Sequence, residues 1–455
     1  DYKVTGVQTC ALPISCCWAS SSSGTGNCSA ARRLPGAPLR RGGDVPAVQM
    51  KILYVVEDRW PPFRADVVEL FAHQLAARGH EVHWAMRRGP GVQVPGRCTT
   101  WHGQAVHLPR VARRPWRALA ELMADLRLLR LAWQGRFDVI QVRDRYAVAL
   151  WAWLVARLTG ARFTFWMSYP FAESKLEQAR QGYVARPWLV ALKGHLIRLL
   201  LYRMVLPLCD HAFVQSERMK DDVAAEGIAP ERMTPVPMGI RAEEVGTAAD
   251  ARAPDTARPL LLYLGILMRL RQTEMLVRVL EIVRRRYPGA RLRFVGEGVS
   301  PSDRQAILDE AARLGLTDAV EVTGFLPMAQ AWQHVREADI CFSPFYPTPV
   351  LQSTSPTKLI EYMALAKCVV ANHHPEQTQV LASAGMGDTV PWDEQAFAAA
   401  AMALLDDPEA ARARAARGPD WVRAHRTYEV IADFVGAMTS RSEEHTSELQ
   451  SPCNL

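Results

Sequence analysis

Short apolar runs and amphipathic stretches alternate along most of the chain. After Met50 the apolar run KILYVV predicts a strand over 51–57, a helical period follows over 66–78, and a second strand over 82–85. Further apolar strands are predicted at 137–142, 162–166 and 211–215. Strands of this kind, separated by helices, are typical of a parallel sheet that is covered by helices. The first half is therefore predicted to be a doubly wound α/β domain.

The same pattern restarts after the polar segment 246–259. From a strand at 260–265 it continues with helices predicted at 273–287, 302–314, 329–338 and 356–366 and strands at 291–295, 320–323, 340–343 and 368–371. A last helical run, 421–438, is expected to pack back across the first domain. Two such domains predict a ligand cleft at the carboxyl ends of their sheets.

The two ends of the chain differ from this pattern. Residues 1–15 and 441–455 resemble translated sequencing-adapter read-through, and 16–49 is rich in Ser, Ala, Gly, Arg and Pro without an apolar period. We expect 1–49 to be an artefactual extension, with a genuine disordered extension as the alternative, and the natural start at Met50. The remaining 391 residues hold 48 basic and 42 acidic side chains, a net charge of +6 that weakly favours anionic partners.

Composition and cysteine usage describe an ordinary globular protein. The 455 residues are 49% apolar and 22% charged, which excludes a collagen-like or wholly disordered chain. Five of the nine cysteines lie in the two ends, and the interior ones are scattered singly at Cys98, Cys209, Cys341 and Cys368. Because the interior has no CxxC pair and no dense cysteine framework, we expect a reducing compartment, the cytoplasm.

One segment, 178–209, combines basic and apolar side chains. It holds five Arg or Lys residues and no Asp or Glu, together with Trp188 and several leucines. Such a segment is a candidate for lying on an anionic lipid surface, at the inner face of the cell membrane. A domain-surface helix with solvated arginines explains the same pattern, and the sequence leaves both open. The sequence contains no window of eighteen or more uncharged apolar residues, so no transmembrane helix is predicted.

Ser355 and Pro356 predict the start of a helix with Lys358 in its first turn, because Ser is a favoured N-cap and Pro a favoured first helical residue. An exposed cation there opposes the helix dipole at a cost of roughly 0.3 to 1 kcal/mol. A bound anion would offset this cost, since free N–H groups and an ammonium together bind phosphate. Glu361, on the same face, can accept hydrogen bonds from sugar hydroxyls. The alternative is a solvated Lys and Glu pair on a surface helix.

Other site patterns are weaker or absent. The run His373-His374-Pro375-Glu376 contains metal-binding residue types, but adjacent histidines after a strand point to opposite sides and no third ligand is evident, so no metal is assigned. The sequence has neither a Walker A motif nor a strand-linked GxGxxG. This disfavours a nucleotide triphosphatase or a dinucleotide oxidoreductase.

An ordered set of short motifs carries a family resemblance. In the second half the motifs are LYLG at 262–265, FVGEG at 294–298, VTGF at 322–325, ADICFSP at 338–344, EYMA at 361–364 and VVA at 369–371. In the first half they are GHEV at 79–82, CDHAFVQS at 209–216 and VPMGI at 236–240. Over 50–440 the chain resembles the retaining GT-B glycosyltransferases of family 4. The resemblance implies an α/β GT-B fold, two doubly wound Rossmann-like domains facing across a cleft.

The resemblance also names the expected parts of the chain. They are an acceptor-side domain at 50–245, a linker at 246–259, a nucleotide-sugar donor domain at 260–420, a C-terminal helix at 421–440 and an artefactual tail at 441–455.

The resemblance implies a donor site in the second domain. Glu361 matches the family glutamate that binds the ribose, and Arg271, with Arg269 and Lys358 nearby, would hold the diphosphate. The remaining donor-binding candidates are Gly265, Gly296 and Gly298, where backbone can approach the nucleotide, Phe325 and Leu326, whose main chain would contact the base, and Ser353, Thr354 and Ser355. We expect Arg271, Lys358 and Glu361 to be the catalytic set, because a retaining transfer needs mostly leaving-group stabilisation by fixed positive charge.

Three departures from the family pattern affect the expected site. Ser353 stands where the family has an earlier glutamate. Ile266 replaces a family arginine, and we expect Arg269 to substitute for it in function. In the first domain, 61–66 lacks the paired glycines and 167–170 lacks the usual histidine, so no catalytic base is named. Asp66 and Tyr169 are the acceptor-side candidates.

The function implied is transfer of a hexose from a nucleotide diphosphate sugar to a lipid-linked or polysaccharide-precursor acceptor, with retention of configuration and without a metal or other cofactor. The partners expected are the donor and a glycan or lipid-linked acceptor, with an anionic membrane surface as a candidate through 178–209 and no nucleic acid. The alternatives are a nucleotide-sugar epimerase on the same fold and a non-catalytic nucleotide-sugar-binding or scaffold protein.

Overall fold

The computed structural model describes residues 49–441 apart from 63, 90–97, 110–115, 183 and 299. The expected extension 1–49 and tail 441–455 therefore lie outside the described residues, except for Gln49 and Arg441. The described chain forms two compact units. The N-terminal unit comprises 49–215, 220–236 and 432–441, and the C-terminal unit comprises 216–219 and 237–431.

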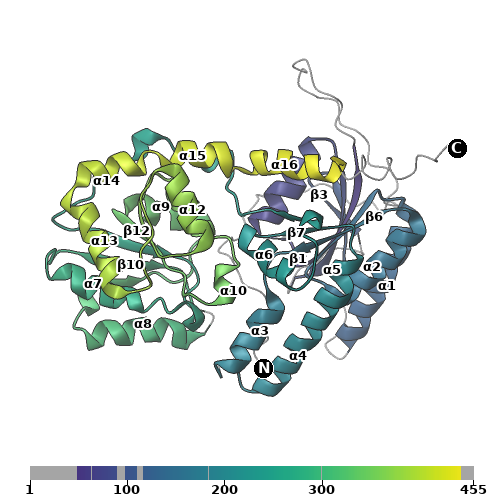
Figure 1. Cartoon of the computed structure of the whole chain (residues 1–455), viewed down its shortest axis with the longest axis horizontal. Coiled ribbons are helices and arrows are strands. Elements are labelled where there is room, and N and C mark those ends of the chain that lie inside the picture. The colour runs from purple at the N-terminus through teal and green to yellow at the C-terminus, as the bar shows by residue number, and fades with distance from the viewer. Residues whose placement is uncertain are drawn as a thin grey trace, which may run out of the picture. The chain divides into compact units, whose positions relative to one another are not determined.

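The N-terminal unit is built on an eight-stranded sheet in the order β3-β4-β2-β1-β5-β6-β7-β8 (Figure 1). Its strands are β1 (Lys51–Trp60), β2 (Glu81–Arg88), β3 (Cys98–Trp101), β4 (Gln104–His107), β5 (Val139–Arg143), β6 (Arg162–Met167), β7 (His211–Val214) and β8 (Met233–Pro235). Neighbouring strands are parallel except for the β3–β4 pair, which is antiparallel. The central strand β1 buries Leu53, Tyr54 and Val55 completely, as expected of a strand covered on both faces.

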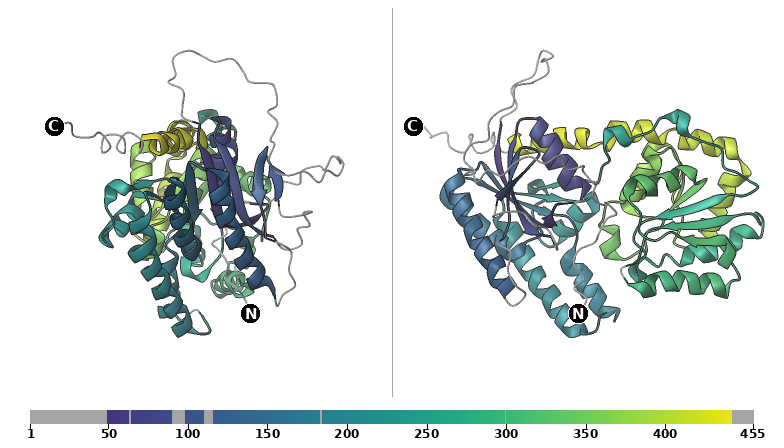
Figure 2. Two further views of the ribbon diagram at one scale, coloured as in Figure 1. Left: turned by 90° about the vertical axis from the view of Figure 1, so that its right-hand side faces the viewer. Right: turned by 180° about the vertical axis from the view of Figure 1, so that it is seen from behind.

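Helices cover this sheet on its two faces. They are η1 (Asp66–Leu75), α1 (Arg117–Gly135), α2 (Tyr146–Thr159), α3 (Phe171–Arg180), α4 (Pro187–Leu200), η3 (Leu201–Val205), α5 (Leu206–Leu208), α6 (Glu217–Ala225) and η4 (Pro230–Arg232). The first of these, η1, is π-helical and holds seven buried residues against the sheet. Figure 2 shows α1, α2 and α4 running alongside one another in one layer, and α2 contacts both of the others.

The C-terminal unit has a five-stranded, fully parallel sheet in the order β11-β10-β9-β12-β13. Its strands are β9 (Leu260–Leu264), β10 (Arg291–Val295), β11 (Val320–Val322), β12 (Ile340–Ser343) and β13 (Cys368–Ala371). Its helices are η5 (Ala242–Glu244), η6 (Ala248–Asp250), η7 (Arg269–Arg271), α7 (Met275–Arg284), α8 (Pro301–Arg313), η8 (Thr317–Ala319), α9 (Met328–Glu337), α10 (Pro349–Gln352), α11 (Thr357–Ala364), α12 (Pro375–Ala384), α13 (Glu394–Asp406), α14 (Pro408–Ala415) and α15 (Gly418–His425).

Two apolar layers hold the C-terminal sheet between its helices. Leu261 and Tyr263 of β9 pack in one layer with side chains of α7 and α13. Leu262 and Leu264, on the opposite face, pack in the other layer with α9, α11 and α15. Because side chains alternate along a strand, each residue of β9 contributes to one layer or the other. Both sheets with their helices give the predicted α/β fold of two doubly wound units.

The predicted helix 421–438 is wrong as a single element. The structure has α15 and then α16 (Tyr428–Arg441), separated by Arg426 and Thr427. The backbone N–H of Ile240 donates to the Arg426 carbonyl at 2.9 Å, and the N–H of Tyr428 donates to the Ile240 carbonyl at 3.0 Å. This short pairing takes the backbone of the two residues out of the helical ladder, so the helix ends and restarts. The apolar period alone does not reveal such a break.

Among the described residues, no helix is both long and apolar enough to cross a membrane.

Candidate functional site

Three glycine turns lie at the carboxyl edge of the C-terminal sheet. Gly265 follows β9, Gly296 follows β10 and Gly324 follows β11, with φ of +142°, +149° and +75°. A Cβ on Gly296 would lie 2.0 Å from the carbonyl oxygen of Gly265. Only glycine allows both the positive φ and this close approach of two loops. The edge therefore presents bare backbone where ligands of open α/β sheets bind.

Gly298, the other predicted glycine, serves a local turn. A Cβ there would lie 2.6 Å from the Ser300 carbonyl oxygen and 2.7 Å from the Asp303 Cβ, at the start of α8. Ser300 caps that helix in a reciprocal capping box with Asp303. The glycine is thus explained by packing whether or not a ligand is bound.

Two cationic side chains converge on Gly265. A Cβ built on Gly265 would lie 3.4 Å from Lys358 Cε and 3.5 Å from Arg271 Nη1. Arg271 comes from η7 and donates to the Tyr263 hydroxyl at 3.4 Å, whereas Lys358 comes from α11. Three separate segments therefore bring a glycine backbone, a guanidinium and an ammonium together. Arg269, at the start of the same turn η7, is exposed.

Lys358 is buried between aromatic rings. Its side chain is 7% exposed, and its Nζ lies 4.5 Å from the centroid of Phe345 and 5.2 Å from that of Tyr263. Ring faces attract a cation, and this attraction holds the ammonium in place. The lysine is thus preorganised beside Gly265.

Glu361 lies one turn further along α11. Burial raises the pKa of its carboxyl to about 7, while the Lys358 ammonium and the Trp332 indole oppose part of that rise. The side chain remains partly exposed. A carboxyl with this pKa changes its charge near neutral pH, which sequence reasoning did not predict.

The start of α11 differs from the prediction. The helix begins at Thr357 with Pro356 as its N-cap residue, and no side chain caps it. The Ser355 hydroxyl instead donates to Glu376 at 2.8 Å and accepts from the Met238 N–H at 3.0 Å. Buried polar groups need partners, and these two bonds satisfy the Ser355 hydroxyl within the unit. The predicted N-cap role of Ser355 is therefore wrong.

The other predicted donor-side residues differ in environment. Ser353 and Thr354 are buried, and the Thr354 hydroxyl donates to the Leu351 carbonyl at 2.7 Å. The Phe325 ring is 48% exposed at the edge of the sheet, whereas Leu326 packs against the apolar layer. Phe325 is thus placed to meet a ligand, and the hydroxyl of Thr354 is used within the fold.

The histidine pair has structural roles. His374 caps α12, accepts from the Gln377 N–H at 3.4 Å and has its pKa lowered to about 4 by burial. His373 Nδ1 lies 2.9 Å from the Thr389 hydroxyl. Within the described ranges, no group of three His, Cys, Asp or Glu side chains is arranged to hold a metal ion.

The carboxyl edge of the N-terminal sheet holds a buried network of charges. Asp66, at the start of η1, is 4% exposed and accepts from Arg143 Nη2 at 2.5 Å. Burial alone would raise the pKa of Asp66, but Arg143 and Arg64 outweigh it and lower the value to about 2. Arg143 is itself 1% exposed and stands 5.7 Å from the Trp166 ring centroid. The pair keeps Asp66 ionised and makes it a weak base.

Arg143 and its neighbour Asp144, both in this network, were not named from the sequence. Asp144, next to Arg143, accepts from the Ser168 N–H at 3.1 Å and from its hydroxyl at 2.5 Å. Burial raises the pKa of Asp144, with Arg143 opposing it. The signal available in the sequence was Arg143-Asp144-Arg145, three consecutive charges directly after the buried strand β5. Tyr169, the other acceptor-side candidate, is buried with its hydroxyl 3.4 Å from the Ser174 hydroxyl.

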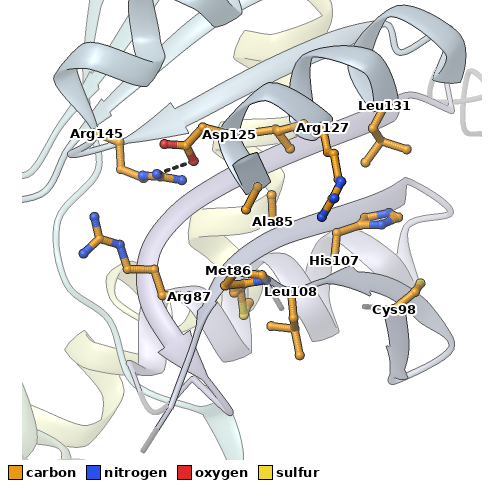
Figure 3. Close-up of a pocket in the computed structure, with 13 residues that line it drawn as sticks. Ala85, Met86, Arg87, Cys98, His107, Leu108, Asp125, Arg127, Leu131 and Arg145 are labelled. Carbon is orange, nitrogen blue, oxygen red and sulfur yellow. Dashed lines mark hydrogen bonds and ion pairs between the residues drawn. The ribbon is translucent and has the colours of Figure 1, made fainter. Parts of the chain in front are cut away.

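A cavity of about 220 Å³ opens beside this network in the N-terminal unit (Figure 3). Its apolar wall is formed mainly by Ala85, Met86, Leu108, Leu128 and Leu131, and its polar groups include Arg87, His107, Asp125, Arg127 and Arg145. Arg145 Nη2 pairs with Asp125 at 2.6 Å, and Arg87 Nη1 pairs with Glu57 at 3.0 Å. The cavity thus combines an apolar wall with cationic groups.

Comparisons with known proteins agree with this arrangement. Residues 65–244 match the family model described as Glycosyltransferase Family 4, and 258–407 match that of Glycosyl transferases group 1. No curated protein sequence matches the chain significantly.

Solved structures share the fold at low identity. Sucrose-phosphate synthase from Thermosynechococcus elongatus is 18% identical with a TM-score of 0.66, over 87% of this chain and all of its own. Anabaena HepE in complex with UDP-glucose is 12% identical with a TM-score of 0.61, over 86% of this chain and all of its own. The lipopolysaccharide outer core galactosyltransferase WaaB is 14% identical with a TM-score of 0.56, over 86% of this chain and all of its own.

The two family models cover one unit each, and the structural matches extend over both sheets. The chain therefore belongs to the group 1, family 4 glycosyltransferases of GT-B fold.

Proposed function

We propose that the chain transfers a hexose from a nucleotide diphosphate sugar to a lipid-linked or polysaccharide-precursor acceptor, with retention of configuration and without a metal. The supporting observation is the convergence of Arg271 and Lys358 on the bare backbone of Gly265. A diphosphate carries negative charge that grows as it leaves, and fixed cations stabilise that charge most when they are already in place. Lys358, held between two rings, meets this condition.

The donor lies, in this proposal, along the carboxyl edge of the C-terminal sheet. Its diphosphate meets Arg271 and Lys358, its ribose hydroxyls donate to Glu361, and its base lies near Phe325 and Leu326. Arg269 is exposed on the same short turn as Arg271 and can reach the same phosphates. During transfer the bond from the sugar anomeric carbon to the diphosphate oxygen breaks, and a bond to an acceptor hydroxyl oxygen forms on the same face. The hydroxyl proton leaves with the diphosphate or with water.

The acceptor is proposed to bind to the N-terminal unit. The cavity of Figure 3 has an apolar wall and Arg127 in its lining, which suits an acceptor that carries an anionic group next to an apolar part. Arg87 and Arg145, also in the lining, pair with Glu57 and Asp125. Asp66 and Tyr169 lie at the same edge of the sheet as positioning residues. For residues 178–209, contact with an anionic membrane is proposed, since α4 exposes Trp188 and Leu192.

A panel of UDP-, GDP- and ADP-sugars in a thermal-shift assay tests the donor. UDP-glucose is the first to try, since the Anabaena HepE structure holds it. We expect one donor to raise the melting temperature of the parent and to do so less for Glu361→Ala. If no donor shifts the parent and Glu361→Ala behaves like it, the proposal is wrong. Epimerised donor formed without an acceptor would instead indicate an epimerase.

A further inference from the structure

Exposed apolar side chains are concentrated on one layer of the N-terminal unit. Among the described residues, 16 large apolar side chains are exposed, and 14 of them lie on α1, α2, α4 and η3 or at the residue preceding α1. They are Trp116, Leu119, Met123, Leu126, Trp133, Trp151, Leu154, Leu158, Trp188, Leu189, Leu192, Leu196, Leu199 and Met204. Single exposed apolar residues are ordinary, but a contiguous group marks an interaction surface.

Each helix presents these residues as a stripe along one side. On α2 the stripe is Trp151, Leu154 and Leu158, spaced three and four residues apart. Trp116, directly before α1, and the exposed α1 residues at 119, 123, 126 and 133 follow the same spacing, with the exposed Arg130 lying among them. Residues at these intervals share one helix face, so α1 and α2 each turn an apolar side outward.

The three stripes lie next to one another. α2 contacts α1 on one side and α4 with η3 on the other, and Figures 1 and 2 show the helices alongside one another. α4 is held to α3 through Gly194, whose missing Cβ would stand 2.9 Å from Leu176, and this is the buried residue of α4. The rest of α4 is therefore available at the surface. We call the exposed side chains of α1, α2, α4 and η3 the three-helix face.

We propose that the three-helix face docks the N-terminal unit on an anionic lipid bilayer. This deepens the membrane contact that the proposed function assigns to residues 178–209, because α1 and α2, outside that segment, supply eight of the fourteen apolar side chains. Four tryptophans, Trp116, Trp133, Trp151 and Trp188, lie among them, and amphipathic indoles favour the boundary between headgroups and acyl chains.

Charge decides between a bilayer and a second copy of the chain. The sequences of α1, α2, α4 and η3 together hold seven Arg or Lys residues against two acidic ones, Glu121 and Asp125. Of the basic side chains, Arg157 pairs with Asp210 and Arg198 with Glu226, so the face keeps a net positive charge. Two such faces docked on each other would oppose cations with cations, whereas anionic headgroups complement them. The lengths agree with surface contact, since α2 and α4 have 14 residues each and a crossing helix needs about 20.

Vesicle co-sedimentation of the full chain tests this face. The vesicles are a phosphatidylglycerol and phosphatidylcholine mixture, with pure phosphatidylcholine as the comparison. The triple variant Trp151→Gln/Leu154→Gln/Leu158→Gln changes α2 outside the basic segment, and Val430→Gln, an exposed apolar site off the face, is the control. We expect the parent and Val430→Gln to bind the anionic vesicles. The triple variant should lose vesicle affinity by roughly tenfold or more.

A second readout does not depend on how much protein binds. Acyl chains brominated near the headgroup quench tryptophans that enter the bilayer. Trp151→Phe should reduce the quenched fraction of the fluorescence, whereas Trp392→Phe, in the C-terminal unit, should leave that fraction unchanged or larger. Folding of each variant is checked by its unfolding transition.

The outcomes separate the claims. If the triple variant binds vesicles like the parent, or Trp151→Phe loses no quenchable signal, the three-helix face is wrong and contact is limited to α4. If the parent ignores anionic vesicles but self-associates through these residues, the bilayer is the wrong partner. Donor binding is measured separately in the thermal-shift panel, so a failure there overturns the proposed transfer reaction and leaves the vesicle result standing.

Discussion

Asp66, buried at the edge of the N-terminal sheet, and Glu361, half-buried at the edge of the C-terminal sheet, have carboxyl pKa values shifted in opposite directions. The pKa of Asp66 is about 2 and that of Glu361 about 7. Burial raises the pKa of both groups, but Asp66 is hydrogen bonded to a guanidinium at 2.5 Å, whereas the Lys358 ammonium stands over aromatic rings and only partly opposes the effect on Glu361.

The difference shows how one fold produces two kinds of edge. In the N-terminal unit the buried cation Arg143 is neutralised by Asp66, so we interpret the pair as stabilising the fold. In the C-terminal unit Arg271 and Lys358 converge on the Gly265 backbone, and Glu361, one turn along α11 from Lys358, has a pKa of about 7. Positive charge fixed beside bare backbone is what an anionic ligand needs. The second edge therefore carries the donor proposal.

The largest expected effect is on stability at the N-terminal edge. Arg143→Met leaves the Asp66 carboxylate buried with only Arg64 beside it, and we expect a loss of about 3 to 5 kcal/mol in the free energy of unfolding. For Lys358→Met we expect a change within about 1 kcal/mol, because the methionine can keep the contact with the Tyr263 and Phe345 rings. Urea unfolding of both variants measures this. Equal losses would contradict the division between a structural and a ligand-binding cation.

The same Lys358→Met variant should lose catalysis. Removing one preorganised group that stabilises developing charge commonly lowers kcat by roughly 100-fold or more. Arg285→Met is the control and should keep the parent rate, because Arg285 is exposed between α7 and the amino end of β10, opposite the carboxyl edge that holds Gly265. Initial rates of sugar release or transfer from the donor found in the panel provide the measurement. A parent-like rate for Lys358→Met would remove the lysine from the mechanism.

Gly296→Ala tests the bare backbone. The new Cβ would meet the Gly265 carbonyl at 2.0 Å, so we expect a loss of about 1 to 3 kcal/mol in stability and weaker donor binding. Gly315→Ala has a positive φ of +67° but nothing within 4 Å of the new Cβ, so it reports the cost of the φ alone. Melting temperature and donor affinity of the two variants are compared. If both variants lose the same stability and the same donor affinity, the close approach of the Gly265 and Gly296 loops does not matter for the site.

Acid should reveal the Asp66 pair. The folded-state pKa of Asp66 lies below its ordinary value, so its contribution to stability is present above about pH 4 and is lost as pH falls through about 2. The loss should reach about 2 kcal/mol. Urea unfolding of the parent and of Asp66→Asn at pH 4.5 and 2.5 isolates it, because other carboxyls titrate in both proteins. If the difference in unfolding free energy between the two proteins is the same at both pH values, the pKa of Asp66 is not lowered in the folded state.

The smallest effect concerns Glu361. Its pKa of about 7 means that the carboxylate, the form that accepts two ribose hydroxyls, becomes populated as pH rises through 7. Donor affinity should therefore increase by roughly threefold from pH 6 to pH 8 in the parent and stay flat in Glu361→Gln. A sugar nucleotide has no ionisation of its own in that range. The opposite trend would mean that the protonated form binds the donor.

The sequence predicted the units better than the connections within them. Strands such as β1 and β9 appear as apolar runs because both faces of a parallel sheet are buried. The hairpin of β3 and β4 was missed since its eight residues include polar and partly exposed positions. The break between α15 and α16 depends on pairing with Ile240, which is distant in the sequence.

Among the site residues, too, those defined by a local pattern were predicted and those defined by distant contacts were not. Lys358 and Glu361 could be predicted because their spacing along one helix places them together. The Asp66–Arg143 pair joins positions 77 residues apart, and no local pattern links them. Ser355 satisfies the local rule for an N-cap but bonds Glu376 and Met238 instead, since its position in the interior offers those partners. Local chemistry was thus predictable, whereas contacts between distant segments were not.

Calorimetric titration of the nucleotide sugar into the parent and into Arg271→Met/Lys358→Met tests the central claim most directly. The account predicts saturable binding to the parent and at least a roughly tenfold weaker affinity for the double variant, which should unfold like the parent. Equal affinity of the two proteins for the donor would contradict the claim that these cations hold its diphosphate at Gly265.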